Sequence, residues 1–600
     1  MMPPMTAAGV VWDLSPLYPR PDDPRVGADG AEAAAKAAAF HARYAGRMAT
    51  LTPAELATAI AEYEAIEEQA RRPSFYASLL FAANAEDPIA RRLAEKTRET
   101  WTGVVNDLTA FELEVKDLDD ARFAVLAADP VLADCRHWME NLRRQKPYAL
   151  SEPEERLANQ KNLAGRDAFA RLFDELTSSF RFRVTVGGEE RELSGEETLA
   201  LLYEPDPDLR ARAQAAFLDR HAQHGLVLTG IFNALLYDHR LECEARSFPD
   251  VVTPTHLDNE VRPATVEAMM VATEQHYPVA QEYFRLKAEL LGLRTLRTSD
   301  VYAPLADTPQ RLPFTDARDL VLDAFASVSA RFADLARDFF AKRWIDAAPR
   351  PGKRLGAFCA SLGPQTNPWV LLTYTDTPRD VATLAHELGH GIHDRLASVQ
   401  RSINHQPPLV LAETASTFAE LALVRTLLAR TTSPDTRRSL LAGRLDDTMA
   451  TVFRQNVLTR FEMAAHARRR AAALTAEELG DLWIAENARL YGTAVEMPPE
   501  YRWGWSYIPH FIHSRFYCYA YVFGELLVLA LWQRWQDEGA GFLPRYFALL
   551  EAGGSEAPDV LLGRMGIDID DPGFWERGFA VIEGLVEELR GTIVAARATA

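Results

Sequence analysis

The segment DTPRDVATLAHELGHGIHDR, residues 376–395, decides the fold prediction. Thr377 can cap a helix, Pro378 suits the first helical position, and Asp380 can complete a capping box. Because an apolar stripe follows at helical spacing, we predict a helix that starts near Thr377 and carries HELGH, residues 386–390, at least one turn beyond its start. The stripe consists of Val381, Leu384, Ala385, Leu388 and Ile392.

The spacing within HELGH is that of a metal site. His386 and His390 are four residues apart and share one helix face, so both rings can bind one Zn²⁺ from the same side. Glu387 is offset by about 100° around the helix, which keeps its carboxylate off the metal but beside a water molecule there. We therefore predict His386 and His390 as ligands and Glu387 as general base. The alternative is a chance match on a helix surface.

A catalytic zinc needs a third protein ligand and one open position. The HExxHxxGxxH pattern would require glycine at position 393 and its third histidine at position 396, but the chain has His393 and Leu396, which excludes that class. Downstream, LVLAETASTFAELALV, residues 409–424, predicts an almost wholly apolar helix whose charges are Glu413 and Glu420, seven apart on one face. A buried carboxylate is costly unless it is paired or bound to a metal, so we predict Glu413 as the third ligand. A carboxylate at a helix start is the alternative.

Three further polar residues near this face have open roles. Glu420 can hold a ligand histidine in place, or it can form an ion pair between helices. Asp394 can orient a ligand imidazole. His393, seven residues after His386, fits a partly exposed histidine without a role better than a ligand.

Most of the remaining chain has helical periodicity, and two places have strand patterns. Residues 180–193, FRFRVTVGGEEREL, alternate around Gly187-Gly188 and predict a hairpin. KRLGAFCAS and WVLLTYT, within residues 353–375, predict two short strands, the second of which could bind a peptide backbone by strand addition. The predicted helical regions are 30–70, 76–117, 152–180, 195–245, 262–292, 314–343, 409–430, 435–473 and 476–490.

These patterns predict a mainly α fold with one small β-sheet beside the HExxH helix. A chain of 600 residues is too long for one core of ordinary size, so two or three lobes are expected. We place the boundary at the hairpin, which gives an N-terminal helical lobe, residues 1–195, and a catalytic domain, residues 196–600.

Composition excludes several classes of function. Lys and Arg total 65 against 85 Asp and Glu, a net charge of -20, which argues against nucleic-acid partners and anionic membranes. The four cysteines form no CxxC and predict neither a disulfide scaffold nor a cysteine metal site, so we expect a reducing cytoplasm. The N-terminal MMPPMTAAGVVWDL lacks the pattern of a signal peptide, and the apolar run 526–532 is too short to span a bilayer.

A second polar cluster lies in PEYRWGWSYIPHFIHSRFYCYAYVF, residues 499–523. A buried aromatic segment is the simplest interpretation, but so many polar-tipped rings need hydrogen-bond partners when they are buried. Some of them are therefore candidates for stabilising an oxyanion formed during metal-assisted peptide hydrolysis. The candidates are Tyr507, His510, His513, Tyr517, Tyr519 and Tyr521.

The chain resembles the thimet-oligopeptidase-like family of zinc metallopeptidases, in particular its oligoendopeptidase F branch. The resemblance spans roughly residues 10–590 and is carried by several blocks in the expected order. These are PYALSEPEERLANQKNLAGRDAFARLFDEL (147–176), GKRLGAFCAS (352–361), DVATLAHELGHGIH (380–393), LAETASTFAE (411–420) and YIPHFIHSRFYCYAY (507–521).

The resemblance implies a helical, ellipsoidal fold with a deep central channel that holds one zinc ion and admits short unfolded peptides. It implies His386, His390 and Glu413 as ligands, with Glu387 as general base. His510 and Tyr517 match the family's oxyanion-stabilising pair, although Tyr519 and Tyr521 compete with Tyr517. Ser514-Arg515 replaces a Gly-Tyr segment that the wider family often has. The implied activity is a cytoplasmic metalloendopeptidase that cleaves internal bonds of oligopeptides.

Two other functions remain open from the sequence. One is a related zinc carboxypeptidase or dipeptidyl carboxypeptidase, in which Arg502 or Arg515 would bind the terminal carboxylate of the substrate. The other is a non-catalytic peptide-binding protein, which the intact set of His386, Glu387, His390 and Glu413 disfavours. The sequence gives neither the side-chain preference nor the oligomeric state.

Overall fold

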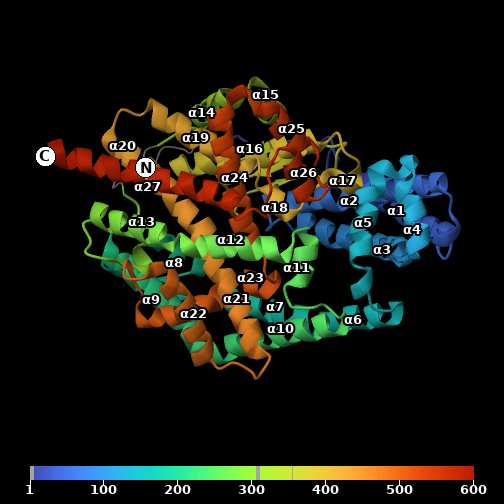
Figure 1. Ribbon diagram of the computed structural model, residues 1–600, viewed down its shortest axis with the longest axis horizontal. Coiled ribbons are helices and arrows are strands. Elements are labelled where there is room, and N and C mark those ends of the chain that lie inside the picture. The colour runs from blue at the N-terminus through green and yellow to red at the C-terminus, as the bar shows by residue number, and fades with distance from the viewer. Residues whose placement is uncertain (1–5, 306–310, 355, 600) are drawn as a thin grey trace. The chain divides into compact units, whose positions relative to one another are not determined.

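The computed structural model describes residues 6–305, 311–354 and 356–599. Helices dominate and strands are few and short, which confirms the mainly α class (Figure 1). The chain forms two compact units, each built from three separate stretches. Unit 1 comprises Met1–Lys146, Pro309–Thr426 and Glu538–Ile567; unit 2 comprises Pro147–Thr308, Leu427–Asp537 and Asp568–Ala600. The division of the chain at residue 195 stays a prediction.

Unit 1 begins with three long helices that pack on one another around a shared apolar cluster. The later stretches add the helices that surround HELGH and a small sheet. In order, the elements are α1 Pro24–Tyr44, η1 Met48–Thr50, α2 Pro53–Ala83, α3 Pro88–Asp117, α4 Asp120–Ala128, η2 Pro130–Cys135, α5 Arg136–Arg144, α14 Phe314–Val328, α15 Ala330–Ala341, β4 Ile345–Asp346, β5 Phe358–Ala360, β6 Trp369–Leu371, α16 Pro378–Ala397, α17 Ser402–His405, α18 Leu409–Ala412, α19 Ser416–Arg430, η8 Gly539–Gly541, α25 Leu543–Glu551 and α26 Pro558–Arg564.

Unit 2 is also helical and carries two small two-stranded sheets. After the short η3 Lys146–Tyr148 at the boundary, its elements are α6 Glu152–Ala164, α7 Arg166–Ser178, β1 Phe182–Val186, β2 Glu189–Leu193, α8 Gly195–Ala200, η4 Leu201–Tyr203, α9 Pro207–Gln223, α10 Gly225–Ala245, α11 Thr253–Asp258, α12 Pro263–Gln275, α13 Tyr277–Leu290, β3 Leu296–Arg297, η5 Thr298–Asp300, α20 Pro434–Thr448, the π-helical η6 Met449–Arg454, α21 Gln455–Arg469, α22 Ala476–Tyr491, β7 Val495–Glu496, η7 Pro499–Tyr507, α23 His510–His513, α24 Cys518–Glu538 and α27 Pro572–Thr599.

Both predicted strand regions form strands. β1 and β2 pair antiparallel around Gly187 and Gly188, whose φ angles of 60° and 87° suit a tight hairpin turn. In unit 1, β5 and β6 pair antiparallel, and both contact α16, so the small sheet lies beside the HExxH helix as predicted. β6 is the central strand, because β4 pairs with it on the other side. The prediction that this strand binds a peptide by strand addition is therefore wrong, since both of its edges are already used.

Several predicted helix boundaries are wrong. α2 runs unbroken through Pro73, where a break was expected, because its residues on both sides are buried and hold the helix in place. The helical structure is instead interrupted before Thr52, which caps the start of α2 and forms a capping box with Glu55. Within the region 195–245, two further helices begin at positions that the periodicity did not reveal. One of them begins at Pro207, with Asp206 as its cap.

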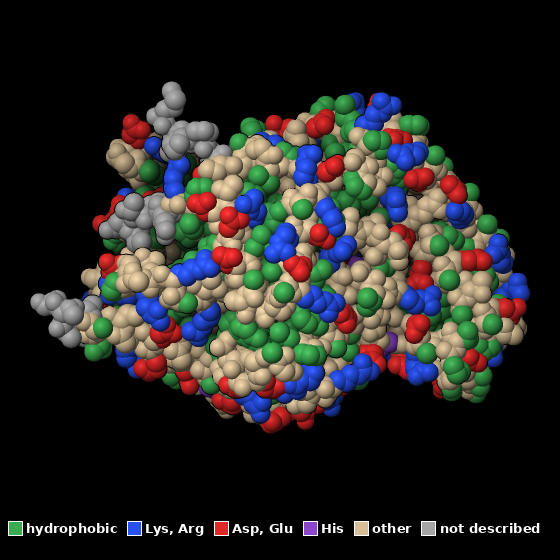
Figure 2. All heavy atoms as spheres, turned by 90° about the horizontal axis from the view of Figure 1, so that it is seen from above, with side chains coloured by type: hydrophobic (Ala, Val, Ile, Leu, Met, Phe, Trp, Pro, Cys, Tyr) green, Lys and Arg blue, Asp and Glu red, His purple; other side chains and the backbone are tan. Residues whose placement is uncertain are grey.

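The surface and the thiols agree with the composition. On the face shown in Figure 2, Lys and Arg side chains are mixed with Asp and Glu and gather into no large basic field. All four cysteines are free thiols. Among the described residues, no helix is both long enough and apolar enough to cross a bilayer.

Candidate metal centre

The candidate metal centre is built on α16 of unit 1. Thr377 and Asp380 form the predicted capping box, in which the Thr377 hydroxyl accepts from the Asp380 N–H at 3.3 Å and Asp380 accepts from the Thr377 N–H at 3.1 Å. Pro378 occupies the first turn. This start fixes the rotation of the helix, so His386 and His390 face the same side, as their spacing requires.

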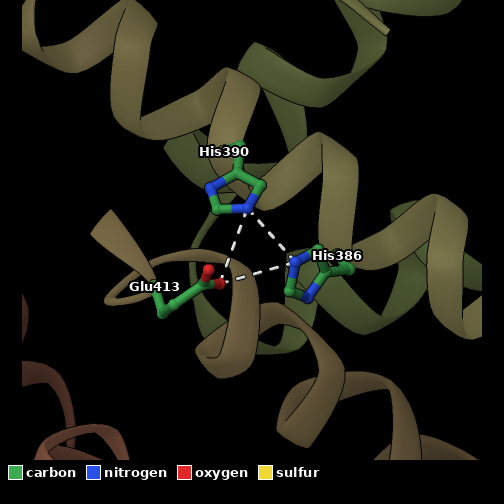
Figure 3. A group of neighbouring side chains, drawn as sticks. All are labelled: His386, His390 and Glu413. Atoms are coloured by element: carbon green, nitrogen blue, oxygen red, sulfur yellow. Dashed lines mark hydrogen bonds and ion pairs between the residues drawn. The ribbon is translucent and has the colours of Figure 1, made fainter. Parts of the chain in front are cut away.

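The structure brings His386, His390 and Glu413 together (Figure 3). The Nε2 atoms of the two histidines are 3.1 Å apart, and Glu413 Oε2 lies 3.4 Å from His386 Nε2 and 3.5 Å from His390 Nε2. Among the described residues, these three form the one group of at least three His, Cys, Asp or Glu side chains whose ligand atoms converge in this way.

The three distances match the donor set of a zinc site. Zinc binds imidazole nitrogen and carboxylate oxygen at about 2.0–2.2 Å, so two ligand atoms of a tetrahedral site lie roughly 3.3 Å apart. The three separations here, 3.1, 3.4 and 3.5 Å, bracket that value. The trio therefore fits three corners of a tetrahedron and leaves the fourth corner for another ligand.

Each imidazole ring also has a hydrogen-bond partner, which holds the ring so that its Nε2 atom faces the other two ligand atoms. Glu420 Oε1 lies 2.6 Å from His386 Nδ1, which confirms the expected contact between Glu420 and a ligand-type histidine. The Ala412 backbone hydrogen-bonds to His390. Although burial alone lowers the pKa of His386, the charge of Glu420 and its hydrogen bond outweigh burial and raise that pKa to about 10. The centre therefore attracts positive charge.

Glu413 does not lie within a continuous helix, which corrects the prediction for residues 409–424. α18 ends at Ala412 and α19 begins at Ser416, so Glu413 occupies the turn between them, and it shares no helix face with Glu420. The reason is close packing against α16. A Cβ atom on Gly389 would lie only 2.5 Å from Ser416 Cα and 2.6 Å from the Ala415 carbonyl oxygen. The glycine of HELGH thus lets the Glu413 turn approach the two histidines.

Glu387 is buried beside the trio, with 6 % of its surface exposed. Burial raises its pKa to about 7, with the charges of Glu413 and Glu420 adding to the effect and that of His386 opposing it. The backbone of Cys359, in β5, hydrogen-bonds to the carboxylate. A carboxyl group with a pKa near neutrality can take up and release a proton at physiological pH, which suits a general base.

His393 and Asp394 contact residues other than the three predicted metal ligands. His393 is buried, contrary to the expected partial exposure, and it hydrogen-bonds to the backbone of Ala412. Burial lowers its pKa to about 3, so the ring is neutral. Both contacts of Asp394 with His405 involve His405 Nε2, which lies 3.6 Å from Asp394 Oδ2 and 3.2 Å from the Asp394 carbonyl oxygen. Within the described part of the chain, Asp394 contacts neither His386 nor His390.

His510 and Tyr517 belong to unit 2, where they lie side by side. Their ring centroids are 5.6 Å apart at an interplanar angle of 25°. Tyr521 joins them, with its hydroxyl 3.5 Å from His510 Nε2. Tyr517 and Tyr521 are four residues apart and share one side at the start of α24, so both remain candidates for the tyrosine of the pair.

Tyr519 lies on the opposite side and is fully buried. Its hydroxyl is surrounded by His256 Nδ1 at 3.1 Å, Asn259 Nδ2 at 2.8 Å and the Thr255 carbonyl oxygen at 3.1 Å. These partners saturate the Tyr519 hydroxyl, so Tyr517 and Tyr521 are the better placed candidates.

The two arginines considered for a substrate carboxylate already have partners. Arg502 pairs with Asp481 at 2.7 Å, and the half-buried Arg515 donates to the Ile512 carbonyl at 2.5 Å. Sequence reasoning also missed Ser416, whose hydroxyl donates to Glu413 Oε2 at 2.6 Å and orients the carboxylate. The position of Ser416, three residues after Glu413, is the signal that could have indicated this contact.

Comparison with known proteins places the chain in a family. The model of peptidase family M3 matches residues 200–581, and the model described as Oligopeptidase F matches residues 114–182. The chain belongs to peptidase family M3. It is a metallopeptidase of the oligopeptidase F branch, which confirms the resemblance found in the sequence.

Members of the M3 family with similar sequences come from several bacteria. The Lactococcus lactis protein named oligoendopeptidase F homolog is 27% identical over 458 residues, which is 76% of each chain. Oligopeptidase PepF of Bacillus subtilis is 24% identical over 463 residues, 76% of this chain and 68% of its own. The crystal structure of oligoendopeptidase-F from Enterococcus faecium shares the fold, with a TM-score of 0.72 at 22% identity over 95% of this chain and 99% of that one.

Proposed function

We propose that this M3 peptidase is a zinc-dependent oligoendopeptidase that hydrolyses internal bonds of short, unfolded peptides. The observation that carries the proposal is the convergence of His386, His390 and Glu413 at tetrahedral zinc distances beside the buried Glu387. The names of the relatives, oligoendopeptidase F and oligopeptidase, support cleavage within short peptides.

We propose one zinc ion per chain, held by His386, His390 and Glu413. When bound, zinc supplies Lewis-acid chemistry that polarises a carbonyl group and acidifies water. Glu420 orients His386 through one hydrogen bond, and Ser416 orients Glu413 through another.

Glu387 is the proposed general base. Its carboxylate takes the proton from the attacking water and then delivers it to the amine that leaves. Burial in the metal-free centre raises its pKa, and a carboxyl group shifted in this direction can both accept a proton and return it.

His510 and Tyr517 are proposed to donate hydrogen bonds to the oxyanion of the tetrahedral intermediate, which rests on the resemblance to the family. Their stacked arrangement and the approach of the Tyr521 hydroxyl to His510 support a preorganised polar cluster. Burial lowers the pKa of His510, so the ring is neutral near pH 7 and donates through one nitrogen only. A cytoplasmic location is part of the proposal, and the four free thiols support it.

The test is a length series of quenched fluorescent peptides blocked at both ends, assayed with chelator and with zinc added back. We expect cleavage of the blocked peptides up to a limiting length, loss with chelator, and recovery with zinc. Glu387→Gln should abolish turnover while the protein still binds one zinc ion. Cleavage restricted to peptides with a free terminus would instead favour the carboxypeptidase alternative, and full activity of Glu387→Gln would remove the proposed base.

A further inference from the structure

Buried cations in this protein generally have a carboxylate partner. In unit 2, Arg210 lies 2.9 Å from Asp300, and Lys287 lies 2.6 Å from Asp446. Another buried pair joins Arg444 to Glu525. This pattern is expected, because an unpaired charge removed from water is costly.

Arg454 departs from this pattern. It is half-buried at the end of the π-helical segment η6, and its one hydrogen-bonding contact in the described chain runs from Nη2 to the Tyr507 hydroxyl at 3.4 Å. No carboxylate of the described residues lies within ion-pairing distance of it. Single π-helical turns are uncommon and often occur at functional sites, so this position is a candidate for binding.

Four tyrosines interact electrostatically with the guanidinium group. The charge of Arg454 interacts with Tyr302, Tyr491, Tyr501 and Tyr507. Tyr491 and Tyr501 are buried, whereas Tyr302 and Tyr507 are half-buried like Arg454 itself, so the group keeps an accessible side. Burial lowers the pKa of Arg454 and electrostatic interaction with the tyrosines raises it, and an arginine side chain stays charged at physiological pH.

Packing holds the two accessible tyrosines in place. Tyr302 stacks on Tyr203 with ring centroids 5.7 Å apart, and Tyr507 packs edge-on against Phe217 at 5.2 Å. A guanidinium group and the hydroxyl groups of packed tyrosine rings can together donate several hydrogen bonds to one small anion. Arginine binds carboxylates in this way through two parallel N–H donors.

This site adjoins the proposed oxyanion residues within the same unit. Tyr507 ends η7, and His510 begins α23 three residues later. The charge of Arg454 also acts on the His510 ring, where it adds to the effect of burial on that pKa. A peptide whose reacting carbonyl lies at His510 would therefore have another part of its chain near Arg454.

We propose that Arg454, with Tyr302 and Tyr507, binds a carboxylate of the peptide substrate. The carboxylate is either the C-terminal group or an acidic side chain, since both present the same two oxygens. This inference rests on the proposed peptidase function for the identity of the ligand. Such a site makes the protein selective for anionic peptides, although the protein itself has a net charge of -20.

Two pairs of peptides separate the two sources of carboxylate. One pair has the same sequence with a free or an amidated C-terminus, and the other is blocked at both ends and carries Glu or Gln at one position, which is moved along the peptide. We expect the wild-type protein to favour the acidic member of one pair by about 10- to 100-fold in kcat/KM, the range of charge-assisted hydrogen bonds. The ratio of kcat/KM for the acidic peptide to kcat/KM for its neutral counterpart should fall to about one in Arg454→Met. It should be intermediate in Arg454→Lys, because lysine lacks the planar pair of N–H donors of arginine.

Arg460→Met is the matched control. Arg460 lies on α21, six residues after Arg454, but it is paired with Glu267 at 2.9 Å and Glu274 at 2.5 Å. Its removal should change stability and leave the acid-to-amide ratio unchanged. The inference is overturned if wild-type protein distinguishes neither pair, or if Arg454→Met and Arg454→Lys keep the wild-type ratio. If Arg454→Met does not fold, which thermal unfolding would reveal, Arg454→Lys decides.

Equilibrium binding separates this inference from the proposed function. Calorimetry with the Glu387→Gln protein and the same peptides needs no turnover. A preference for the acidic peptide that disappears when Arg454→Met is added supports the carboxylate site, even if wild-type protein hydrolyses nothing. Hydrolysis by wild-type protein together with equal binding of both peptides would instead support the peptidase and reject the site.

Discussion

Gly389→Ala tests whether the glycine of HELGH sets the position of the third metal ligand. The new Cβ would lie 2.5 Å from Ser416 Cα, 2.6 Å from the Ala415 carbonyl oxygen and 2.8 Å from the Ser416 nitrogen. All three atoms belong to the backbone, so no side-chain rotation relieves the contacts. To reach 3.4 Å, the lower limit of ordinary contact, α16 and the turn must separate by about 0.9 Å.

That separation would move Glu413 away from both imidazoles. Its Oε2 would change from 3.4 and 3.5 Å to roughly 4 Å from the two Nε2 atoms, whereas tetrahedral zinc requires roughly 3.3 Å. We expect zinc affinity to fall on the order of 10- to 100-fold and kcat/KM to fall by about 100-fold, as misplacements of about 1 Å do. Overpacking should also reduce the free energy of unfolding by about 1–3 kcal/mol.

Gly391→Ala is the control, because its Cβ would also be overpacked but against the Phe339 ring, at 2.2 Å from Cζ. Zinc affinity is measured by competition with a chromogenic chelator, and stability by thermal unfolding of both variants. We expect both variants to lose stability and only Gly389→Ala to lose zinc affinity strongly. Unchanged zinc affinity in Gly389→Ala, or equal losses in the two variants, would refute the reasoning.

Three further predictions follow from contacts around the two polar clusters. Glu420→Gln should weaken zinc binding by about 10- to 100-fold in the chelator assay, and wild-type affinity would show that its contact to His386 is dispensable. Tyr519→Phe should lower the melting temperature with little change in kcat, whereas Tyr517→Phe should lower kcat with little change in melting temperature; the reverse pattern would exchange their roles. Burial raises the pKa of Glu462 to about 8, against about 4.3 in the unfolded chain, so the folded state binds the extra proton and its stability falls as pH rises from about 5 to 8. Glu462→Gln should remove this part of the pH dependence in denaturant titrations, and an unchanged slope would contradict it.

Local signals allowed accurate predictions where one short stretch decides the structure. The start of α16 depends on Thr377 and Asp380, three residues apart, and both hydrogen bonds of the box are present. The hairpin depends on Gly187 and Gly188, whose positive φ angles the turn requires. Neither feature needs a distant part of the chain.

Distant packing explains where the predictions were wrong. Residues 409–424 contain no glycine or proline, so their pattern predicts one helix, yet the contact with Gly389 in α16 coincides with a break at residues 413–415. The central position of β6 depends on β4, which is only two residues long and has no periodicity to detect. In both cases the deciding partner lies more than twenty residues away in the sequence.

Charged residues show most clearly that a sequence does not reveal partners that are distant along the chain. Glu413 could be selected from the sequence because a carboxylate in an apolar segment needs a counter-charge, and the two histidines offered a metal as that charge. Arg454 carries no comparable signal, since an arginine in a helical pattern ordinarily faces water or an acidic neighbour. Its unusual state is the absence of a carboxylate partner among the described residues, and this becomes visible only when its neighbours in space are known. A sequence therefore reveals a charge that its own segment cannot accommodate, but not a charge whose partner must come from the substrate.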